Sequence, residues 1–218
     1  MQKFKMKNYF LDNETDTFFY NFKASIKYYL RTFFWRKNKE KIENIISSNE
    51  DCVKYFSKYS WRAYTLLSKS YTINKIPVSK GLELFKADLD FVNDLSKKLG
   101  VKNFILEKYK ILEFEEIEVY FGTSDTMAEE GIYSLQMYYK GEEIYEEKLS
   151  FAKKGALRIT MLQGKKGINE IQKELTKKFF GLRPHFFILE IAKYFGEALG
   201  LSEFYGIKDE FQDRKSVV

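Results

Sequence analysis

The spacing of apolar residues predicts helices in the first part of the chain and strands in the second. Up to about residue 102, apolar residues recur every three or four positions, as they do on one face of a helix. The clearest helix follows Ser79 and ends at Gly100, because glycine readily takes the left-handed conformation that terminates helices. Its expected buried stripe comprises Leu82, Phe85, Leu89, Val92 and Leu99.

An earlier helix is unusually aromatic and is expected within FFYNFKASIKYYLRTFFWRK. Lys23, Lys27 and Arg31, spaced four apart, lie on one face of it. The aromatic stripe on another face either packs into the core, as we expect for most helices of this kind, or lies on an anionic membrane surface. This stripe comprises Phe19, Phe22, Ile26 and Phe33.

From Phe104 onward the period changes to two, which predicts strands. Alternating apolar residues run through IEVYF, IYSLQMYY, EIYEEKLSF and ALRITMLQ. Lys140 and Gly141 make one turn between these segments, and residues 153–155 make another. Connections this short cannot join parallel neighbours, so we expect an antiparallel meander.

Helical spacing returns after the strands. Asn169, with Gln172 three residues later, fits a capping box at the start of a helix that ends at Gly181. Pro184 suits the first turn of a further helix, where its missing N–H is not needed. The segment SEFYGI then predicts a short final strand.

This order of elements predicts an α+β fold: helices, a meander sheet, two helices and a strand. We expect residues 1–102 to form a helical part. Residues 103–218 should form the sheet part and pack with the first part as one unit.

Composition narrows the class of protein. The net charge is +6, but acidic residues are interspersed almost everywhere, and no motif indicates binding to nucleic acid. The single cysteine, Cys52, excludes an internal disulfide, and one cysteine with one histidine cannot supply the usual ligands of a zinc site. Without a secretory signal or an apolar run of about 20 residues, we expect a cytoplasmic protein, peripheral to the inner membrane if the aromatic helix binds lipid.

Several charged residues have plain structural explanations. Glutamate pairs at 115–116, 129–130 and 146–147 lie on or beside expected strands, and we interpret them as solvated strand faces. His185 lies near the start of a helix and lacks a nucleophile motif, which favours a packing or surface role. No general base is identified.

A set of short motifs occurs in a specific order: KYSWRAY, SKGLELFKADLDFV, LSF, LQG, LTKKFFGLRP and GI. In this order and spacing, the chain from about Tyr28 to Ile207 resembles the VirK/YbjX family of bacterial proteins, a domain family of unknown function. The chain departs from the family after GI, where KDEFQDRKSVV replaces a segment with an Asn and a His. The motif residues are Thr176, Gly181, Leu182, Arg183, Pro184 and Gly206.

The VirK/YbjX resemblance implies a cytoplasmic bacterial protein that affects envelope properties. Members are associated with virulence, surface-protein placement and resistance to cationic antimicrobial peptides. The resemblance implies no particular reaction. Arg183 could bind a carboxylate or phosphate in two-pronged fashion, although we favour a structural pairing within the fold.

The segment MLQGKKGINEIQ is the main candidate for chemistry, since a strand, a glycine turn and a helix start suit an anion. With the meander before it, this layout resembles the core of the GCN5-related acyltransferases, whose corresponding turn holds the pyrophosphate of acyl-CoA. That resemblance implies cofactor contacts at Gln163, Gly164, Lys165 and Gly167. A purely structural turn is the alternative, and the one we favour.

Two functions stay open. One is acyl transfer from acyl-CoA or an acyl-carrier thioester, with Tyr205 as a candidate proton donor. The other is a non-enzymatic adaptor that binds a partner through the aromatic helix or a sheet edge. The sequence does not predict the acceptor substrate or the oligomeric state.

Overall fold

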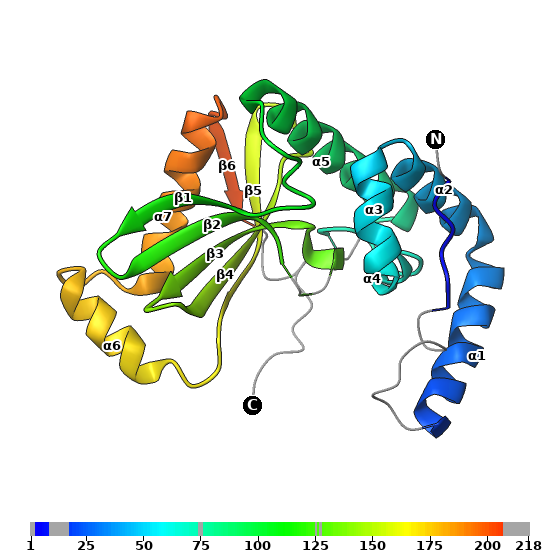
Figure 1. Ribbon diagram of the computed structural model, residues 1–218, viewed down its shortest axis with the longest axis horizontal. Helices are drawn as coiled ribbons and strands as arrows, with labels where there is room; N and C mark the ends of the chain where they lie inside the picture. The colour runs from blue at the N-terminus through cyan, green and yellow to red at the C-terminus, as the bar shows by residue number, and fades with distance from the viewer. Residues whose placement is uncertain (1–2, 9–17, 74–75, 125, 127, 207–218) are drawn as a thin grey trace.

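The computed structural model describes residues 3–8, 18–73, 76–124, 126 and 128–206. Within them a helical first half precedes a sheet flanked by helices (Figure 1). The helices are α1 (Phe18–Phe34), α2 (Arg36–Ser47), α3 (Glu50–Lys58), α4 (Ser60–Thr65), α5 (Val78–Leu99), the 3-10 helix η2 (Ala128–Glu130), α6 (Asn169–Lys178) and α7 (Pro184–Ala198). The strands are β1 (Tyr109–Phe114), β2 (Ile117–Thr123), β3 (Tyr133–Tyr139), β4 (Glu142–Ser150), β5 (Ala156–Gly164) and β6 (Glu203–Gly206).

The strands of the described residues form one sheet of six, in the order β1-β2-β3-β4-β5-β6. Strands β1 to β5 pair antiparallel, as the alternation predicts. β6 lies parallel to β5, because the chain crosses over through α6 and α7 before it returns to the sheet. The α+β class is therefore confirmed. Lys140 and Gly141 both have positive φ, which tight two-residue hairpins require.

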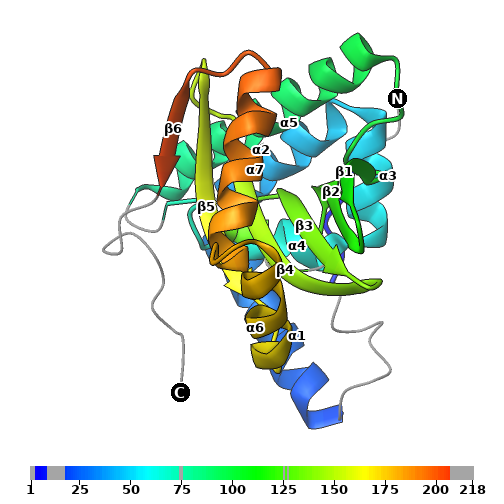
Figure 2. The ribbon, with the colours of Figure 1, turned by 90° about the vertical axis from the view of Figure 1, so that its left-hand side faces the viewer.

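Helix α7 covers one face of the sheet, and the helical half of the chain packs at the end where β2 and β4 finish. Figure 2 shows α7 in front of the strands and α2, α4 and α5 behind them. On the α7 side, Phe195 packs on Phe121 of β2, with ring centroids 4.8 Å apart. Gly196 lets α7 approach closely, since a Cβ there would lie 2.6 Å from the ring of Phe204. Buried residues of β2 and β3 complete this layer: Ile117, Val119, Tyr133, Leu135 and Met137.

A buried carboxyl joins the helical half to the sheet. Asp88, on α5, accepts hydrogen bonds from the Tyr71 hydroxyl at 2.7 Å, the Ser150 hydroxyl at 3.1 Å and the Phe151 N–H at 2.5 Å. The Tyr71 oxygen in turn accepts from the N–H of Ile132, at 3.1 Å. Burial raises the pKa of Asp88 to about 7, while the three hydrogen bonds act in the opposite sense. This network fixes α5 against the end of β4.

The local sequence signals predicted some helix features correctly and others wrongly. Gly100 ends α5 in the left-handed conformation and Pro184 begins α7, as predicted. Leu99 is exposed, so its place in the buried stripe was wrong, because it lies in the last turn beyond the packed part of α5. The capping box was also wrong: Asn169 is already helical, and the side chain of Gln172 donates to Tyr145 of β4 instead.

Glu147 of β4 lies in the apolar layer beneath α7. Its partners across the sheet are Leu135 and Leu162, and its side chain is fully buried. Neither carboxyl oxygen has a hydrogen-bond partner among the described residues. Burial alone raises the pKa of Glu147 to about 8. The interpretation of residues 146–147 as a solvated strand face is therefore wrong, because β4 is a central strand, with α7 over Glu147 and with Thr126 and Lys148 beside Glu146.

The Asp88 network predicts a large loss of stability when its acceptor is removed. Asp88→Leu leaves the Phe151 N–H and two hydroxyls without their acceptor, which should cost about 2–4 kcal/mol in urea unfolding. Asp90→Asn, on the exposed side of the same helix, removes only an ion pair with Lys86 and should cost less than about 0.5 kcal/mol. Equal stabilities of the two variants would contradict this role.

The buried Glu147 predicts a specific dependence of stability on pH. Its folded pKa, about 8, exceeds the ordinary value of 4.5, so the folded state keeps a proton that the unfolded chain releases. Its contribution to stability is therefore lost progressively as pH rises from about 4.5 to 8. Relative to wild type, the free energy of unfolding of Glu147→Gln, measured by thermal denaturation, should rise by on the order of 3 kcal/mol between pH 5 and pH 8.5. A difference that stays constant, as we expect for the exposed control Glu142→Gln, would contradict this prediction.

Candidate functional site

Helix α1 projects from the body of the molecule and contacts it along one edge (Figure 1). Tyr28 lies on this edge and is buried. Its hydroxyl donates to the carbonyl oxygen of Met6 at 2.8 Å, and its ring centroid lies 5.4 Å from that of Tyr64. Arg31 also lies over the Tyr64 ring, 5.7 Å from the centroid. Burial is the main cause that raises the pKa of Tyr28 to about 12, so this anchor is neutral at ordinary pH.

The aromatic stripe of α1 faces solvent. Phe33 is 76% exposed, and Phe22 and Ile26 are exposed as well. The prediction that the stripe packs into the core is therefore wrong for these residues, and the side chain of Phe19 lies outside the described ones. The physical reason is that the helix is anchored through the Tyr28 edge, which turns the stripe outward. The exposed apolar residues here are Phe22, Ile26, Tyr29, Leu30, Phe33, Phe34 and Trp35.

A basic stripe runs beside the apolar one. Lys23, Lys27 and Arg31 are exposed, and the repeat of 3.6 residues per turn places each of them next to the apolar stripe. The sequence of α1 contains no acidic residue. None of the described helices has the length and apolar character needed to cross a bilayer. The surface has the composition of helices that lie flat in a membrane interface.

A polar pocket of about 240 Å³ opens where the helical half meets the sheet, on the face opposite α7. Gln136 of β3 and Glu146 of β4 are paired across the strands and form part of its wall. The pocket is lined by Tyr59, Leu106, Glu107, Lys108, Thr123, Ser124, Thr126, Gln136, Tyr138, Glu143, Glu146 and Lys165.

A β-bulge brings two carboxylates into this pocket. The pairing of β3 with β4 skips Ile144, which is the extra residue of the bulge. Residues three apart point to opposite faces of a regular strand, but the bulge re-aims them, and Glu143 and Glu146 both line the pocket. Glu143 forms an ion pair with Lys165, at 2.9 Å.

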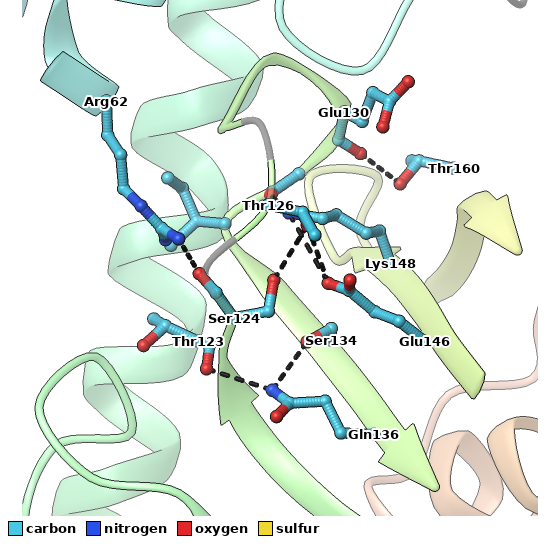
Figure 3. A network of polar contacts seen from close by, with 12 residues as sticks. Arg62, Thr123, Ser124, Thr126, Glu130, Ser134, Gln136, Glu146, Lys148 and Thr160 are labelled. Carbon is cyan, nitrogen blue, oxygen red and sulfur yellow. Dashed lines mark hydrogen bonds and ion pairs between the residues drawn. The ribbon is translucent and has the colours of Figure 1, made fainter. Parts of the chain in front are cut away.

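Polar side chains surround the Glu146 carboxylate in the wall of the pocket (Figure 3). Thr126 donates to Glu146 Oε1 at 2.9 Å, and Lys148 Nζ lies 3.8 Å from the same oxygen. Lys148 donates to the carbonyl oxygen of Gly131 at 2.9 Å. Burial lowers the pKa of Lys148 to about 8, while the nearby Glu146 acts in the opposite sense. A carboxylate and an amine are thus held together with little water around them.

Arg62 fixes one side of the pocket. This residue of the KYSWRAY motif is fully buried, donates to the carbonyl oxygen of Ser124 and to the Tyr55 hydroxyl, and lies 5.6 Å from the centroid of the Tyr59 ring. Because Ser124 and Tyr59 both line the pocket, Arg62 holds two of its walls in place.

The turn after β5 adjoins the pocket through Lys165. Of the four predicted cofactor contacts, Gln163 lies opposite Glu146 on the neighbouring strand, and Gly167 has a φ of +83°. Gly164 packs against the Tyr145 ring, since a Cβ there would lie 3.1 Å from it. The N–H of Lys165 donates to a β4 carbonyl at 2.9 Å. These contacts give Gly164 and Lys165 roles in packing, and the cofactor role of the turn stays a prediction.

Tyr205 does not meet this turn. It lies opposite Arg158 on the parallel strand, and six residues of β5 separate that position from Gly164, about 20 Å in an extended strand. Its hydroxyl contacts Glu203 and Lys153 at 2.5 Å. The proposed proton donor and the proposed cofactor turn therefore lie at opposite ends of β5.

The LTKKFFGLRP motif builds the connection between α6 and α7. The Thr176 hydroxyl donates within α6 to the carbonyl oxygen of Gln172 at 2.6 Å, and the N–H of Gly181 donates to the carbonyl oxygen of Thr176 at 2.8 Å. Arg183 caps α7 through its backbone, whereas Leu182 is exposed. Gly206 ends β6 opposite Ile159.

Sequence reasoning missed Glu146, Lys148 and Arg62. The charged run EEK within an alternating segment was the available signal, because charges in the middle of a strand are costly when that strand is central. The central place of β4 depends on β5 and on α4, which the local pattern does not reveal.

Comparison with known proteins gives two relatives. A Haemophilus influenzae protein described as uncharacterized is 26% identical over 199 residues, which cover 88% of this chain and 66% of that protein. Membrane protein LapB of Mannheimia haemolytica is 28% identical over 104 residues, or 46% of each chain. The chain thus matches less than two thirds of either relative's length. No solved structure matches this chain.

A family described as a protein of unknown function, DUF535, matches residues 17–218. The match covers α1, the sheet and both helices of the crossover, so the aromatic helix and the polar pocket both lie within the family's extent. These comparisons do not bear on the looser resemblance to acyltransferases. The chain belongs to the DUF535 family, as its resemblance to the VirK/YbjX proteins predicts.

Proposed function

We propose that the protein works at an anionic membrane surface, with α1 lying in the interface between headgroups and acyl chains. The main observation that supports this proposal is the exposed aromatic stripe of α1. An exposed apolar surface of this kind marks contact with a membrane or another protein, because leaving it in water is unfavourable.

The adjoining charges favour lipid over a protein partner. Lys23, Lys27 and Arg31 lie beside the stripe, and α1 has no acidic residue to repel anionic headgroups. Each basic residue near such a surface contributes about 1 kcal/mol. A partner protein would need an acidic groove of matching length. LapB, one of the relatives, is named a membrane protein, which supports the same choice.

A location on the membrane also fits an effect on envelope properties. The VirK/YbjX resemblance associates its members with virulence and with resistance to cationic antimicrobial peptides. In our proposal, the chain exerts such an effect while bound to the cytoplasmic leaflet. The body of the protein, with its polar pocket, would then be held close to the lipid surface.

Acyl transfer from acyl-CoA or an acyl carrier is a second candidate function. The observation that favours it is that Lys165 belongs both to the turn after β5 and to the lining of the polar pocket. A carrier phosphate at the turn would bring a thioester near that pocket. Glu146 would then be the general base that the sequence did not identify.

Vesicle co-sedimentation tests the membrane proposal. We expect binding to vesicles of phosphatidylcholine with phosphatidylglycerol, and little binding to phosphatidylcholine alone. Leu30→Ser with Phe33→Ser should weaken binding at least tenfold, because each apolar side chain that enters the interface contributes about 1 kcal/mol or more. Lys23→Ala with Lys27→Ala should weaken it roughly thirtyfold at low salt and less at high salt.

Matched control variants distinguish binding through α1 from non-specific binding through other exposed side chains. Leu99→Ser with Phe114→Ser removes two exposed apolar side chains elsewhere, and Lys80→Ala with Lys98→Ala removes two exposed charges. Both pairs should leave binding unchanged. Equal losses in the α1 variants and the controls, or equal binding of wild type to neutral vesicles, would refute the proposal.

Thermal scans with coenzyme A, acetyl-CoA and a long-chain acyl-CoA test the second candidate. Ligand at about 100 times its dissociation constant should add about 2.7 kcal/mol of stability. Lys166→Glu, in the exposed part of the turn, should remove the shift by repelling the phosphates, whereas Lys154→Glu at the β4–β5 turn should not. If none of the three ligands raises the melting temperature, direct use of coenzyme A is excluded.

A further inference from the structure

The charges in the polar pocket are held apart. Lys108 Nζ donates to the Tyr138 hydroxyl at 2.7 Å and to Gln136 Oε1 at 3.3 Å, both of which are neutral. Among the described residues, no carboxylate forms an ion pair with Lys108. The pocket therefore presents an ammonium group that no described carboxylate neutralises.

Glu146 presents the opposite charge on the next strand. Among the residues that the structure describes, it accepts one hydrogen bond, from Thr126 at 2.9 Å, although an ionised carboxylate can accept about four. Lys148, at 3.8 Å, lies beyond direct hydrogen-bond distance and donates to Gly131 instead. The Glu146 carboxylate thus keeps capacity for a further donor, and a cationic donor would gain most from it.

Gln136 holds Lys108 on the strand next to Glu146. Its amide nitrogen donates to the Thr123 carbonyl and to the Ser134 hydroxyl, each at 3.0 Å, which directs its oxygen toward Lys108. Its backbone position pairs with Glu146, so the acceptor of Lys108 and the Glu146 carboxylate belong to neighbouring strands and line the same pocket. A ligand that satisfies both groups needs an anion at one end and a cation at the other.

The size and the remaining walls limit the ligand further. A volume of about 240 Å³ equals roughly eight waters at about 30 Å³ each, so the ligand is small. Tyr59 and Leu106 line the same pocket and suit a short carbon linker. Lys165, paired with Glu143, lines the same pocket and offers a second cation to an anionic group.

We propose that this pocket binds a small zwitterion, in which a primary ammonium and a phosphate or carboxylate are joined by a short carbon linker. The ammonium donates to Glu146 and Thr126. The anion accepts from Lys108, with Lys165 as a second donor. The same chemistry occurs in free metabolites and in ethanolamine headgroups of lipids. The proposal does not depend on the membrane contact of α1.

Isothermal titration with O-phosphoethanolamine tests the site directly, with ethanolamine and inorganic phosphate as separate probes. The zwitterion should bind at least tenfold more tightly than either component, because only it fills both ends. Glu146→Gln and Lys108→Met should each weaken its binding at least tenfold. Glu142→Gln, exposed on the same strand, and Lys154→Met, exposed in a turn, should leave it unchanged.

Titration with glycerophosphoethanolamine distinguishes the two possible sources of the zwitterion, a lipid headgroup and a free metabolite. Tighter binding of this diester supports a lipid headgroup as ligand, and tighter binding of the monoester supports a free metabolite. Inorganic phosphate binding as tightly as the zwitterion, a neutral sugar binding in its place, or no binding of any probe would overturn the proposal. If Glu146→Gln does not fold, Lys108→Met decides, because Lys108 is exposed at the rim.

Discussion

The position of Asp88 determines how the two halves of the chain meet. Burial of a carboxyl costs less free energy when it is hydrogen-bonded, and the partners of Asp88 come from the loop before α5 and from the end of β4. Moving α5 away from the end of β4 would leave the Ser150 hydroxyl and the Phe151 N–H without this acceptor. The network therefore holds the helical half against this end of the sheet, and the polar pocket lies where the two halves meet.

Two functional surfaces result from this packing. Where α4 approaches the sheet, Arg62 and Lys148 bury their charges and leave the polar pocket beside Glu146. Where the packing ends, α1 keeps only its Tyr28 edge against the body and presents its aromatic stripe to solvent. The fold thus buries polar groups beside the pocket and exposes apolar groups on α1. Both arrangements are unfavourable in free energy without a ligand or a membrane.

The sequence predicted those structural features that depend on residues close together in the chain. Alternation around Val119 and Leu135 predicted the meander, and Gly100 and Pro184 predicted helix ends, because these signals are local. The burial of Glu146 and Glu147 was not predictable, since it depends on strands and helices distant in sequence. The outward stripe of α1 was mispredicted for the same reason: a helical repeat shows that Phe33 lies on a face, but not whether another element covers that face.

Tryptophan fluorescence tests the central claim, that α1 enters an anionic membrane interface. In the variant Trp61→Phe, Trp35 at the end of α1 is the single tryptophan, because the chain has two. With anionic vesicles, we predict a blue shift of its emission and quenching by lipids brominated on their acyl chains. Emission that is unchanged by a large excess of these vesicles, and unquenched by the brominated lipids, would contradict the claim.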